Sequence, residues 1–259
     1  MAEELRTVAG VRVEWNETGD GAPILFLHPG IGIAPDAPVL ERLAAKCRVI
    51  APSHPGFGRS EQPKDFTTID DLAYFYLDLM DELRLEHVTL VGVSFGGWIA
   101  AEIAVKSCAR ITRLVLADAL GIKVGARDTR DIADMFAMSE ADFLALAYAN
   151  PEVGKRDYKA MSEADILPIA RNREAMARYG WQPYMHDPKL KQRLHRIGVP
   201  ALVLWGEADR IVSPDYGKAY AAALPSARFE ILAGAGHFPH VEQPDDFASR
   251  VLAFAETAP

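Results

Sequence analysis

The sequence predicts an α/β protein with a mostly parallel central sheet that is covered by helices on both faces. Short apolar runs alternate with segments whose apolar residues recur at helical spacing. Most of these runs are continuous, which is typical of strands buried on both faces. The chain begins differently, because LRTV, the turn Ala9-Gly10 and VRVEW alternate in the manner of an antiparallel hairpin.

The same patterns place each element. The expected strands after the hairpin are residues 23–28, 48–53, 87–93, 111–118, 200–206 and 227–234. The expected helices are residues 37–46, 69–85, 96–107, 215–223 and 244–255.

The alternation of strands and helices stops near residue 121 and resumes near residue 198. The intervening segment has helical patterns, several prolines and no strand-like run. We therefore predict that 1–120 forms the first part of a core, 121–197 a helical cap, and 198–259 the second part of the core. An insertion there lies over the carboxyl ends of the strands, where open α/β sheets bind ligands.

Composition and charge narrow the choice of partners. The 259 residues carry a net charge of -8 with acidic and basic side chains interspersed, so neither nucleic acid nor an anionic membrane surface is an expected partner. No apolar run approaches the roughly 20 residues of a membrane span. The opening MAEELRTVAG lacks the apolar stretch of a secretory signal, and Cys47 and Cys108 stand in no metal or redox spacing. These features favour a cytoplasmic protein without a metal site.

The motif GVSFGG, residues 92–97, stands between an expected strand and an expected helix. A Gly-x-Ser-x-Gly turn at such a junction holds its serine in a strained conformation at the top of the sheet. A Cβ at either glycine would strike the neighbouring strand or helix. The N–H of Phe95, at the start of the helix, can stabilise a developing oxyanion. We predict that Ser94 is a nucleophile; the alternative is a glycine-rich turn with a bystander serine.

A serine hydroxyl needs a base, normally histidine. Among seven histidines, His237 lies in a loop of small residues after the last expected strand, at the same sheet edge as Ser94. His240 lies three residues further on, towards a helix, and is the competing candidate, more typical of a packing role.

The base in turn needs an orienting carboxylate. Asp209 lies in the loop after the strand 200–206 and is followed by apolar residues that would desolvate it. Glu207, in the same loop, and Asp118, at the end of the strand 111–118, are alternatives. We predict Asp209, because the order serine, aspartate, histidine along the chain is the one expected with this serine turn.

A second oxyanion donor is expected from the loop after the strand 23–28. Gly30 allows a close approach of the backbone, and Ile31 is the alternative donor. Pro29 has no N–H. The competing interpretation is that His28-Pro29-Gly30 is merely a tight turn.

Together these residues resemble the α/β-hydrolase superfamily, in particular its serine esterases and its capped meta-cleavage-product hydrolases. The resemblance runs through PILFLHPG, SHPGFGRS, GVSFGG, WGEADRIV and GAGHFPHVEQP, essentially the whole chain. It implies an eight-stranded, mostly parallel sheet, a cap, a Ser–Asp–His triad and no cofactor. Two departures are Pro29 in the oxyanion loop and Ser53 where an aspartate is usual. His54, beside Ser53, is a further candidate for lining the site.

A serine nucleophile excludes the aspartate chemistry of haloalkane dehalogenases and epoxide hydrolases, and the cysteine chemistry of dienelactone hydrolases. We predict an esterase or lactonase that cleaves small to medium apolar substrates through an acyl-enzyme on Ser94. The residues expected to line its pocket are Ile31, Met135, Phe136, Trp181, Tyr184, Val212 and Phe238.

Two other functions stay open. A carbon–carbon hydrolase of aromatic ring-cleavage products would use the same triad. The enzymes of that kind hold a substrate carboxylate with a basic residue, for which Arg171 and Arg173 are candidates, and they often have an asparagine where this chain has Val93. A non-catalytic ligand receptor is a more distant alternative, against which an intact triad argues.

Overall fold

The computed structural model describes residues 4–257, and a seven-stranded sheet forms its centre. The strands of this sheet are β3 (Glu17–Thr18), β4 (Pro23–Leu27), β5 (Arg48–Ile50), β6 (Val88–Val93), β7 (Ile111–Ala117), β8 (Ala201–Gly206) and β9 (Ala227–Leu232). They lie in the order β3-β5-β4-β6-β7-β8-β9, and every neighbouring pair is parallel except β3 with β5. The predicted fold class is confirmed. Residues 1–3 and 258–259, which the predicted core segments include, lie outside the described part.

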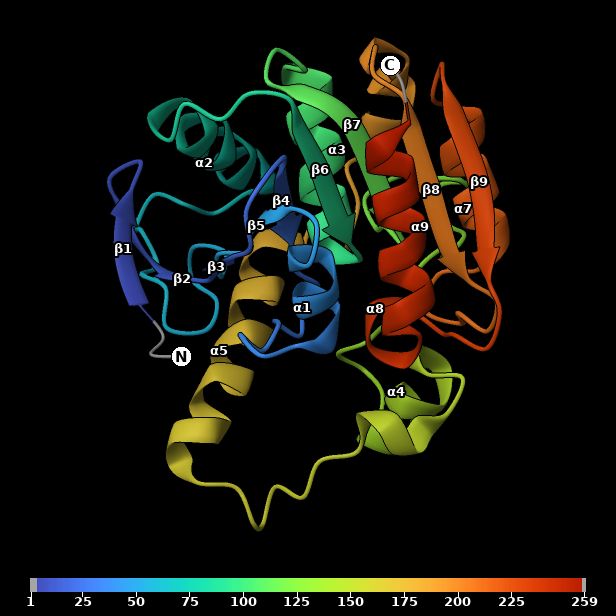
Figure 1. Ribbon diagram of the computed structural model, residues 1–259. Coiled ribbons are helices and arrows are strands. Elements are labelled where there is room, and N and C mark those ends of the chain that lie inside the picture. The colour runs from blue at the N-terminus through green and yellow to red at the C-terminus, as the bar shows by residue number, and fades with distance from the viewer. Residues whose placement is uncertain (1–3, 258–259) are drawn as a thin grey trace.

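The predicted hairpin is also confirmed, but it is not part of the main sheet. Strands β1 (Glu4–Val8) and β2 (Val11–Trp15) form a separate two-stranded sheet, seen at the left of Figure 1. The eight-stranded sheet that the resemblance implies is therefore corrected to seven strands plus this hairpin, among the described residues. Asn16 separates the two sheets: its side chain bonds the Pro35 carbonyl, and the chain joins the main sheet only at Glu17.

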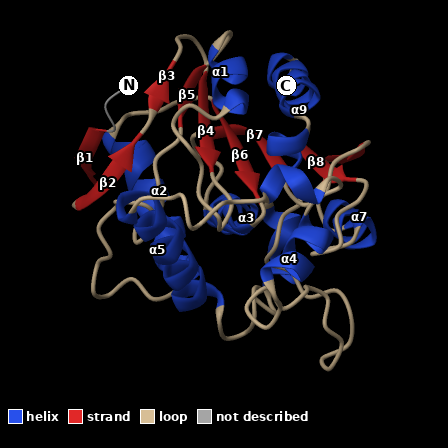
Figure 2. Ribbon diagram, turned by 90° about the horizontal axis from the view of Figure 1, so that it is seen from below, coloured by secondary structure: helices blue, strands red, loops and turns tan. Residues whose placement is uncertain are grey.

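Helices cover both faces of the sheet, as Figure 2 shows. On one face lie α1 (Pro38–Ala44), α8 (Pro239–Glu242) and α9 (Pro244–Glu256); on the other lie α2 (Ile69–Glu82), α3 (Phe95–Lys106) and α7 (Pro214–Ala222). Strand β4 shows why its sequence is continuously apolar. Ile24 and Phe26 face the first layer, whereas Leu25 and Leu27 face the second.

The segment between β7 and β8 holds α4 (Glu140–Ala147), the 3-10 turn η1 (Pro151–Gly154), α5 (Glu163–Gly180), α6 (Leu190–Arg193) and the 3-10 turn η2 (Leu194–Arg196). Within this described segment the β pairing is limited to one isolated bridge, between Gly121 and His186. Figure 1 shows α4 and the beginning of α5 beyond the carboxyl ends of the strands. The boundaries of a cap at 121 and 197 stay a prediction.

The parallel register brings five strand ends to one edge of the sheet. Leu27 pairs with Gly92, Val93 with Ala117, and Gly206 with Leu232. The loops after β4, β6, β7, β8 and β9 therefore meet at this edge. None of the helices in the described part of the chain has the length and apolar character that crossing a membrane requires.

Candidate active site

Ser94 occupies a strained turn between β6 and α3. Its φ of 53° and ψ of -115° lie in a region that non-glycine residues rarely adopt, at a cost of about 1–3 kcal/mol. The glycines around it permit this turn. A Cβ on Gly92 would lie 2.4 Å from the Gly96 carbonyl oxygen, and a Cβ on Gly96 would lie 2.1 Å from that of Leu27. The strain and the close packing together hold the serine side chain at the edge of the sheet.

A continuous hydrogen-bond chain runs from Ser94 through His237 to Asp209. The distance from Ser94 Oγ to His237 Nε2 is 2.7 Å, and that from His237 Nδ1 to Asp209 Oδ2 is 2.8 Å. Asp209 Oδ1 accepts the N–H groups of Ile211 at 2.8 Å and Val212 at 3.1 Å. A neutral imidazole that donates Nδ1–H to the carboxylate presents Nε2 as the acceptor of the serine proton.

The competing residues take no part in this hydrogen-bond chain. Glu207 is exposed and accepts the Gly234 N–H at 3.4 Å. His240 is buried among the rings of Phe26, Phe238 and Phe247. The structure thus brings His237 and Asp209 to Ser94, and leaves Glu207 and His240 out of the hydrogen-bond chain. Asp118 lies near Asp209 but bonds the Gly206 N–H instead of His237.

Three backbone N–H groups near Ser94 are candidates for an oxyanion site. Gly30 and Ile31 line the same cavity as Ser94, and Phe95 is the first residue of α3. The Gly30, Ile31 and Phe95 N–H groups have no acceptor among the described residues, so Gly30 and its alternative Ile31 are both available to an oxyanion together with Phe95. A Cβ on Gly30 would lie 2.2 Å from Met176 Sδ on α5, so a larger residue would displace the Met176 side chain.

Two buried histidines, His28 and His54, hold the loop that carries Gly30. The His54 N–H donates to His28 Nε2 at 3.0 Å, and His54 Nε2–H donates to the His28 carbonyl at 2.9 Å. The two rings stack 3.7 Å apart, and the Tyr76 hydroxyl bonds His54 Nδ1. The suggestion that His54 lines the site is wrong, because these internal contacts use both of its ring nitrogens and bury it completely.

Asn172 on α5 also supports the site, and the sequence did not reveal this role. Its Nδ2 donates to the Ile31 carbonyl at 3.0 Å, and its Oδ1 accepts the Gly58 N–H at 2.7 Å. One side chain thus ties the oxyanion loop to the loop that follows β5. A lone asparagine in a polar helix carries no sequence signal for such a role.

The buried histidines predict a loss of stability in acid. Burial lowers the pKa of His28 to about 4 and that of His240 to about 3. The unfolded chain binds these protons near pH 6.5, so stability is lost as the pH falls from about 6.5 towards 4. At pH 5 each histidine costs about 2 kcal/mol of the free energy of unfolding.

Urea unfolding at pH 7 and pH 5 checks this prediction. His240→Leu is expected to reduce the loss of stability between the two pH values by about 2 kcal/mol. His195→Gln, a change at an exposed histidine, serves as the control with the wild-type loss. An unchanged loss in His240→Leu would contradict the prediction.

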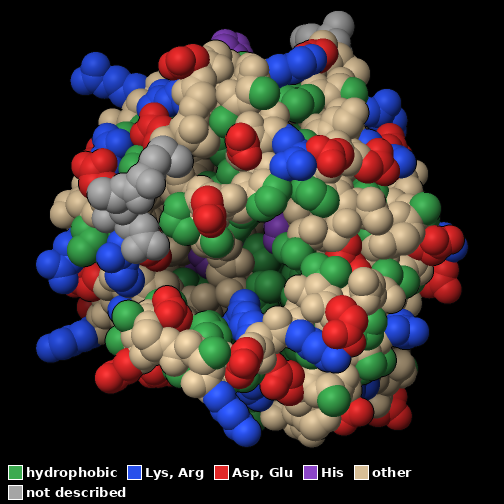
Figure 3. Space-filling model, turned by 60° about the horizontal axis from the view of Figure 1, so that its bottom comes forward, with side chains coloured by type: hydrophobic (Ala, Val, Ile, Leu, Met, Phe, Trp, Pro, Cys, Tyr) green, Lys and Arg blue, Asp and Glu red, His purple; other side chains and the backbone are tan. Residues whose placement is uncertain are grey.

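A cavity of about 340 Å³ opens above Ser94. Figure 3 shows the hollow, with apolar side chains inside and charged ones around its rim. Four of the predicted pocket residues line it: Ile31, Met135, Phe136 and Phe238. The lining also includes residues that the sequence analysis did not propose for it, among them Glu140, Tyr148, Arg156, Tyr158, Asn172 and Met176.

Three predicted pocket residues do not line this cavity, and their assignment is corrected. Trp181 follows the end of α5 and is 59% exposed on the outer side of the molecule. The Tyr184 hydroxyl accepts the Met135 N–H at 2.8 Å and donates to the Ala133 carbonyl, so it supports the lining loop from behind. Val212 is 1% exposed and packs in the core.

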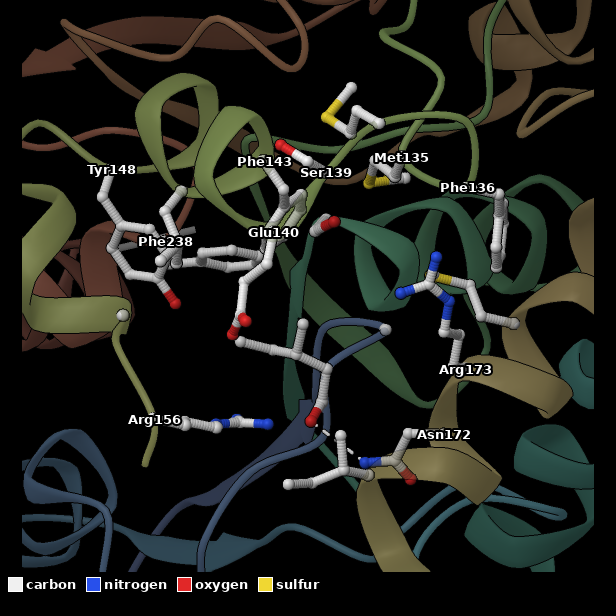
Figure 4. Close-up of a pocket in the computed structure, with 18 of the residues that line it drawn as sticks. Met135, Phe136, Ser139, Glu140, Phe143, Tyr148, Arg156, Asn172, Arg173 and Phe238 are labelled. Carbon is white, nitrogen blue, oxygen red and sulfur yellow. Dashed lines mark hydrogen bonds between the residues drawn. The ribbon is translucent and has the colours of Figure 1, made fainter. Parts of the chain in front are cut away.

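The cavity lining has more positive than negative groups, although the whole chain has a net charge of -8. Its charged residues are Arg156, Arg173 and Glu140, and Figure 4 shows Arg156 and Glu140 pointing inward. The Arg173 guanidinium lies 5.4 Å from the centre of the Phe136 ring. Neither arginine forms an ion pair with a described residue. Arg171 points elsewhere and donates to the Ser60 carbonyl at 2.6 Å.

Comparisons with known proteins agree with this architecture. A profile of the alpha/beta hydrolase family matches residues 24–250. A 2-hydroxymuconate semialdehyde hydrolase from Pseudomonas sp. (strain CF600) is 28% identical over 96% of this chain and 92% of its own.

Two solved structures share the fold. The enol-lactonase from Burkholderia xenovorans LB400 has a TM-score of 0.78 at 24% identity, over 98% of this chain and 100% of its own. The meta-cleavage product hydrolase from Pseudomonas fluorescens IP01 has a TM-score of 0.74 at 22% identity, over 97% of this chain and 96% of its own. The family match, which covers most of the residues, decides the classification: this chain belongs to the alpha/beta hydrolase family.

Proposed function

We propose that this chain is a serine hydrolase that cleaves a carbon–carbon bond in a small, acidic ring-cleavage product. The observation that carries the proposal is the presence of Ser94 and an unpaired guanidinium, that of Arg173, in the lining of one cavity. The first supplies a nucleophile and the second a site for a carboxylate.

Relatives of this chain support the choice of substrate. One is named a 2-hydroxymuconate semialdehyde hydrolase, and another, from Pseudomonas putida and 24% identical, a 2-hydroxy-6-oxo-2,4-heptadienoate hydrolase. Both names describe a carboxylate and a carbonyl at opposite ends of a short chain. The excess of positive charge in the cavity lining suits such an anion.

The proposed reaction begins when His237 takes the proton of Ser94 and Oγ attacks the carbonyl carbon. The Gly30 and Phe95 N–H groups stabilise the oxyanion. The acid reacts as its 2-oxo tautomer, in which the enol proton has moved to the carbon next to the reacting carbonyl. As the carbonyl reforms, the bond between these two carbons breaks, and its electron pair is delocalised onto the 2-oxo group as a dienolate. His237 returns its proton to this dienolate, and a water molecule that His237 activates then hydrolyses the acyl-enzyme.

The proposal predicts a specific effect of removing the Arg173 side chain. Arg173→Ala is expected to raise KM for an acidic dienoate by about 10- to 100-fold, because one charged hydrogen-bond partner is lost. Steady-state kinetics with the dienoate and with neutral p-nitrophenyl butyrate measure the effect, and KM for the neutral ester is expected to stay within about threefold.

The control is Arg178→Ala, on the same helix, which removes an arginine that pairs with Glu174 instead of lining the cavity. It is expected to behave as wild type. An equal increase in KM for both substrates in Arg173→Ala would mean that Arg173 shapes the cavity without recognising a carboxylate.

Hydrolysis of esters or lactones is the second candidate. Val93 favours it, because the carbon–carbon hydrolases that this chain resembles often have an asparagine before the serine. Val93 is buried in the apolar layer under α1 and α9, so its side chain offers no hydrogen bond to a substrate. The same nucleophile, base and oxyanion donors serve both reactions.

One comparison of substrates separates the candidates. 2-Hydroxymuconate semialdehyde, prepared from catechol, and p-nitrophenyl butyrate are assayed with wild type and Ser94→Ala. The proposal expects kcat/KM for the semialdehyde to exceed that for the ester by about 100-fold or more. A preference for the ester favours the second candidate. Failure of the folded protein to hydrolyse either substrate favours a non-catalytic receptor.

A further inference from the structure

Asp118 is a buried carboxyl group to which the reaction described above gives no role. It follows β7 with a φ of 45°, and it is 0% exposed. Its Oδ1 accepts the Gly206 N–H at 2.9 Å. Its Oδ2 is buried and has no hydrogen-bond donor among the described residues. A carboxylate is an acceptor at both oxygens, so an ionised Asp118 would leave one charged oxygen buried without a partner.

The neighbours of Asp118 destabilise its ionised form further. One carboxylate oxygen of Asp118, one of Asp209 and one ring nitrogen of His237 all lie within 4.8 Å of one another. Burial, followed by the negative charge of Asp209, raises the pKa of Asp118 well above its ordinary value, and Glu242 on α8 adds to the repulsion. Among the described residues, the hydrogen bonds and ion pairs of this cluster include no lysine or arginine that would offset the charge.

Hydrogen bonds decide which of the two aspartates keeps the negative charge. Asp209 accepts three N–H groups, from Ile211, Val212 and His237. Asp118 accepts one, from Gly206. Because hydrogen bonds to the charged form favour that form, the negative charge belongs on Asp209 and the proton on Asp118.

We propose that Asp118 is a positioning residue that carries a proton on Oδ2 and donates it in a hydrogen bond to the Asp209 carboxylate. This inference rests on the proposed roles of Ser94, His237 and Asp209. The bond supplies a fourth donor to Asp209, which fixes the orientation of the carboxylate that holds His237. It also limits the buried cluster to one negative charge, that of the carboxylate facing His237 Nδ1.

Two substitutions separate a protonated Asp118 from an ionised one. Asp118→Asn replaces the O–H donor with an N–H donor of similar shape, and asparagine tolerates a positive φ. Asp118→Gly removes the donor without straining the backbone. Asp215→Asn, a change at an exposed aspartate of α7, is the matched control.

The readout is the rate at which a fluorophosphonate labels Ser94, followed from pH 5 to pH 9, because it does not depend on the natural substrate. Asp118→Asn is expected to label within about threefold of wild type, with the acid limb of the profile unmoved. Asp118→Gly is expected to label about 10-fold more slowly across the profile. Thermal unfolding of each variant separates this effect from a loss of folded protein.

Two results would overturn the inference. If Asp118 is ionised, Asp118→Asn removes a negative charge near His237, so the acid limb of the labelling profile moves to lower pH. If Asp118→Gly labels as wild type does, the side chain has no positioning role.

An infrared difference spectrum of wild type against Asp118→Asn reads the proton directly and needs no activity. The inference predicts that wild type shows the carbonyl stretch of a protonated carboxyl group and that Asp118→Asn lacks it. A wild type without this band overturns the inference. A folded wild type that the probe does not label shows instead that the proposed function has failed. The infrared result still decides the protonation of Asp118, also where Asp118→Gly does not fold.

Discussion

Replacing Ser94 by alanine is expected to lower kcat by about 10⁴- to 10⁶-fold, which is the largest effect of any single change in this chain. Without Oγ there is no nucleophile, and the hydrogen bond to His237 Nε2 at 2.7 Å is lost. The oxyanion donors and the cavity remain, so residual catalysis and substrate binding are expected to persist. Steady-state kinetics with the semialdehyde and the p-nitrophenyl ester measure the loss.

Ser249→Ala is the control for Ser94→Ala, because Ser249 is exposed on α9 and remote from the cavity. Circular dichroism and thermal unfolding of both variants establish that they fold. A folded Ser94→Ala that retains more than about 1% of the wild-type kcat would contradict a nucleophilic role.

Replacing Asp209 by asparagine is expected to lower kcat by about 10⁴-fold, as the loss of the triad aspartate does in serine proteases. The Asp209 carboxylate accepts His237 Nδ1–H at 2.8 Å. An amide can turn its NH₂ towards Nδ1 and so favour the tautomer that carries its proton on Nε2. That tautomer cannot accept the proton of Ser94.

Glu207→Gln makes the same chemical change two residues away in the same loop, and we expect it to keep the wild-type kcat within about twofold. The reverse result, an active Asp209→Asn and an inactive Glu207→Gln, would contradict the assignment. The double variant Asp118→Asn/Asp209→Asn asks whether Asp118 can substitute for Asp209. If it can, the activity left in Asp209→Asn falls further in the double variant.

Most of the core elements were predictable because each strand and helix has its own apolar period. The expected helix 69–85 begins at Ile69, as predicted, but ends at Glu82. Leu83 closes the helix and Arg84 turns into a positive φ of 50°, a change that an apolar pattern does not reveal. The strand count was wrong for a different reason: it came from the resemblance, whereas β1 and β2 form a separate sheet and the two-residue strand β3, which leaves no periodic signal, lies at the edge of the main one.

The candidate hydrogen-bond chain was accessible from the sequence because its three residues each follow a recognisable strand. Parallel strands bring such positions to one edge without any knowledge of side-chain packing. The lining of the pocket was harder to predict from the sequence. Aromatic identity placed Trp181 and Tyr184 in the lining, but whether a loop turns a ring inward or outward depends on tertiary contacts such as those of the Tyr184 hydroxyl.

The two candidate arginines show the same limit of prediction from the sequence. Arg171 and Arg173 are two residues apart, so their side chains project from α5 in directions about 200° apart. One therefore reaches the Ser60 carbonyl while the other lines the cavity. The sequence contains both residues but not the rotation of the helix, which depends on contacts such as those of Asn172 with two loops.

The central claim is that Ser94 is an activated nucleophile, and mass spectrometry of the fluorophosphonate-treated protein tests it most directly. Our account predicts one phosphonyl group, on the peptide that contains Ser94, formed rapidly in wild type and at least about 10³-fold more slowly in His237→Ala. A folded protein that acquires no adduct, or one that carries the adduct on another residue, would contradict it.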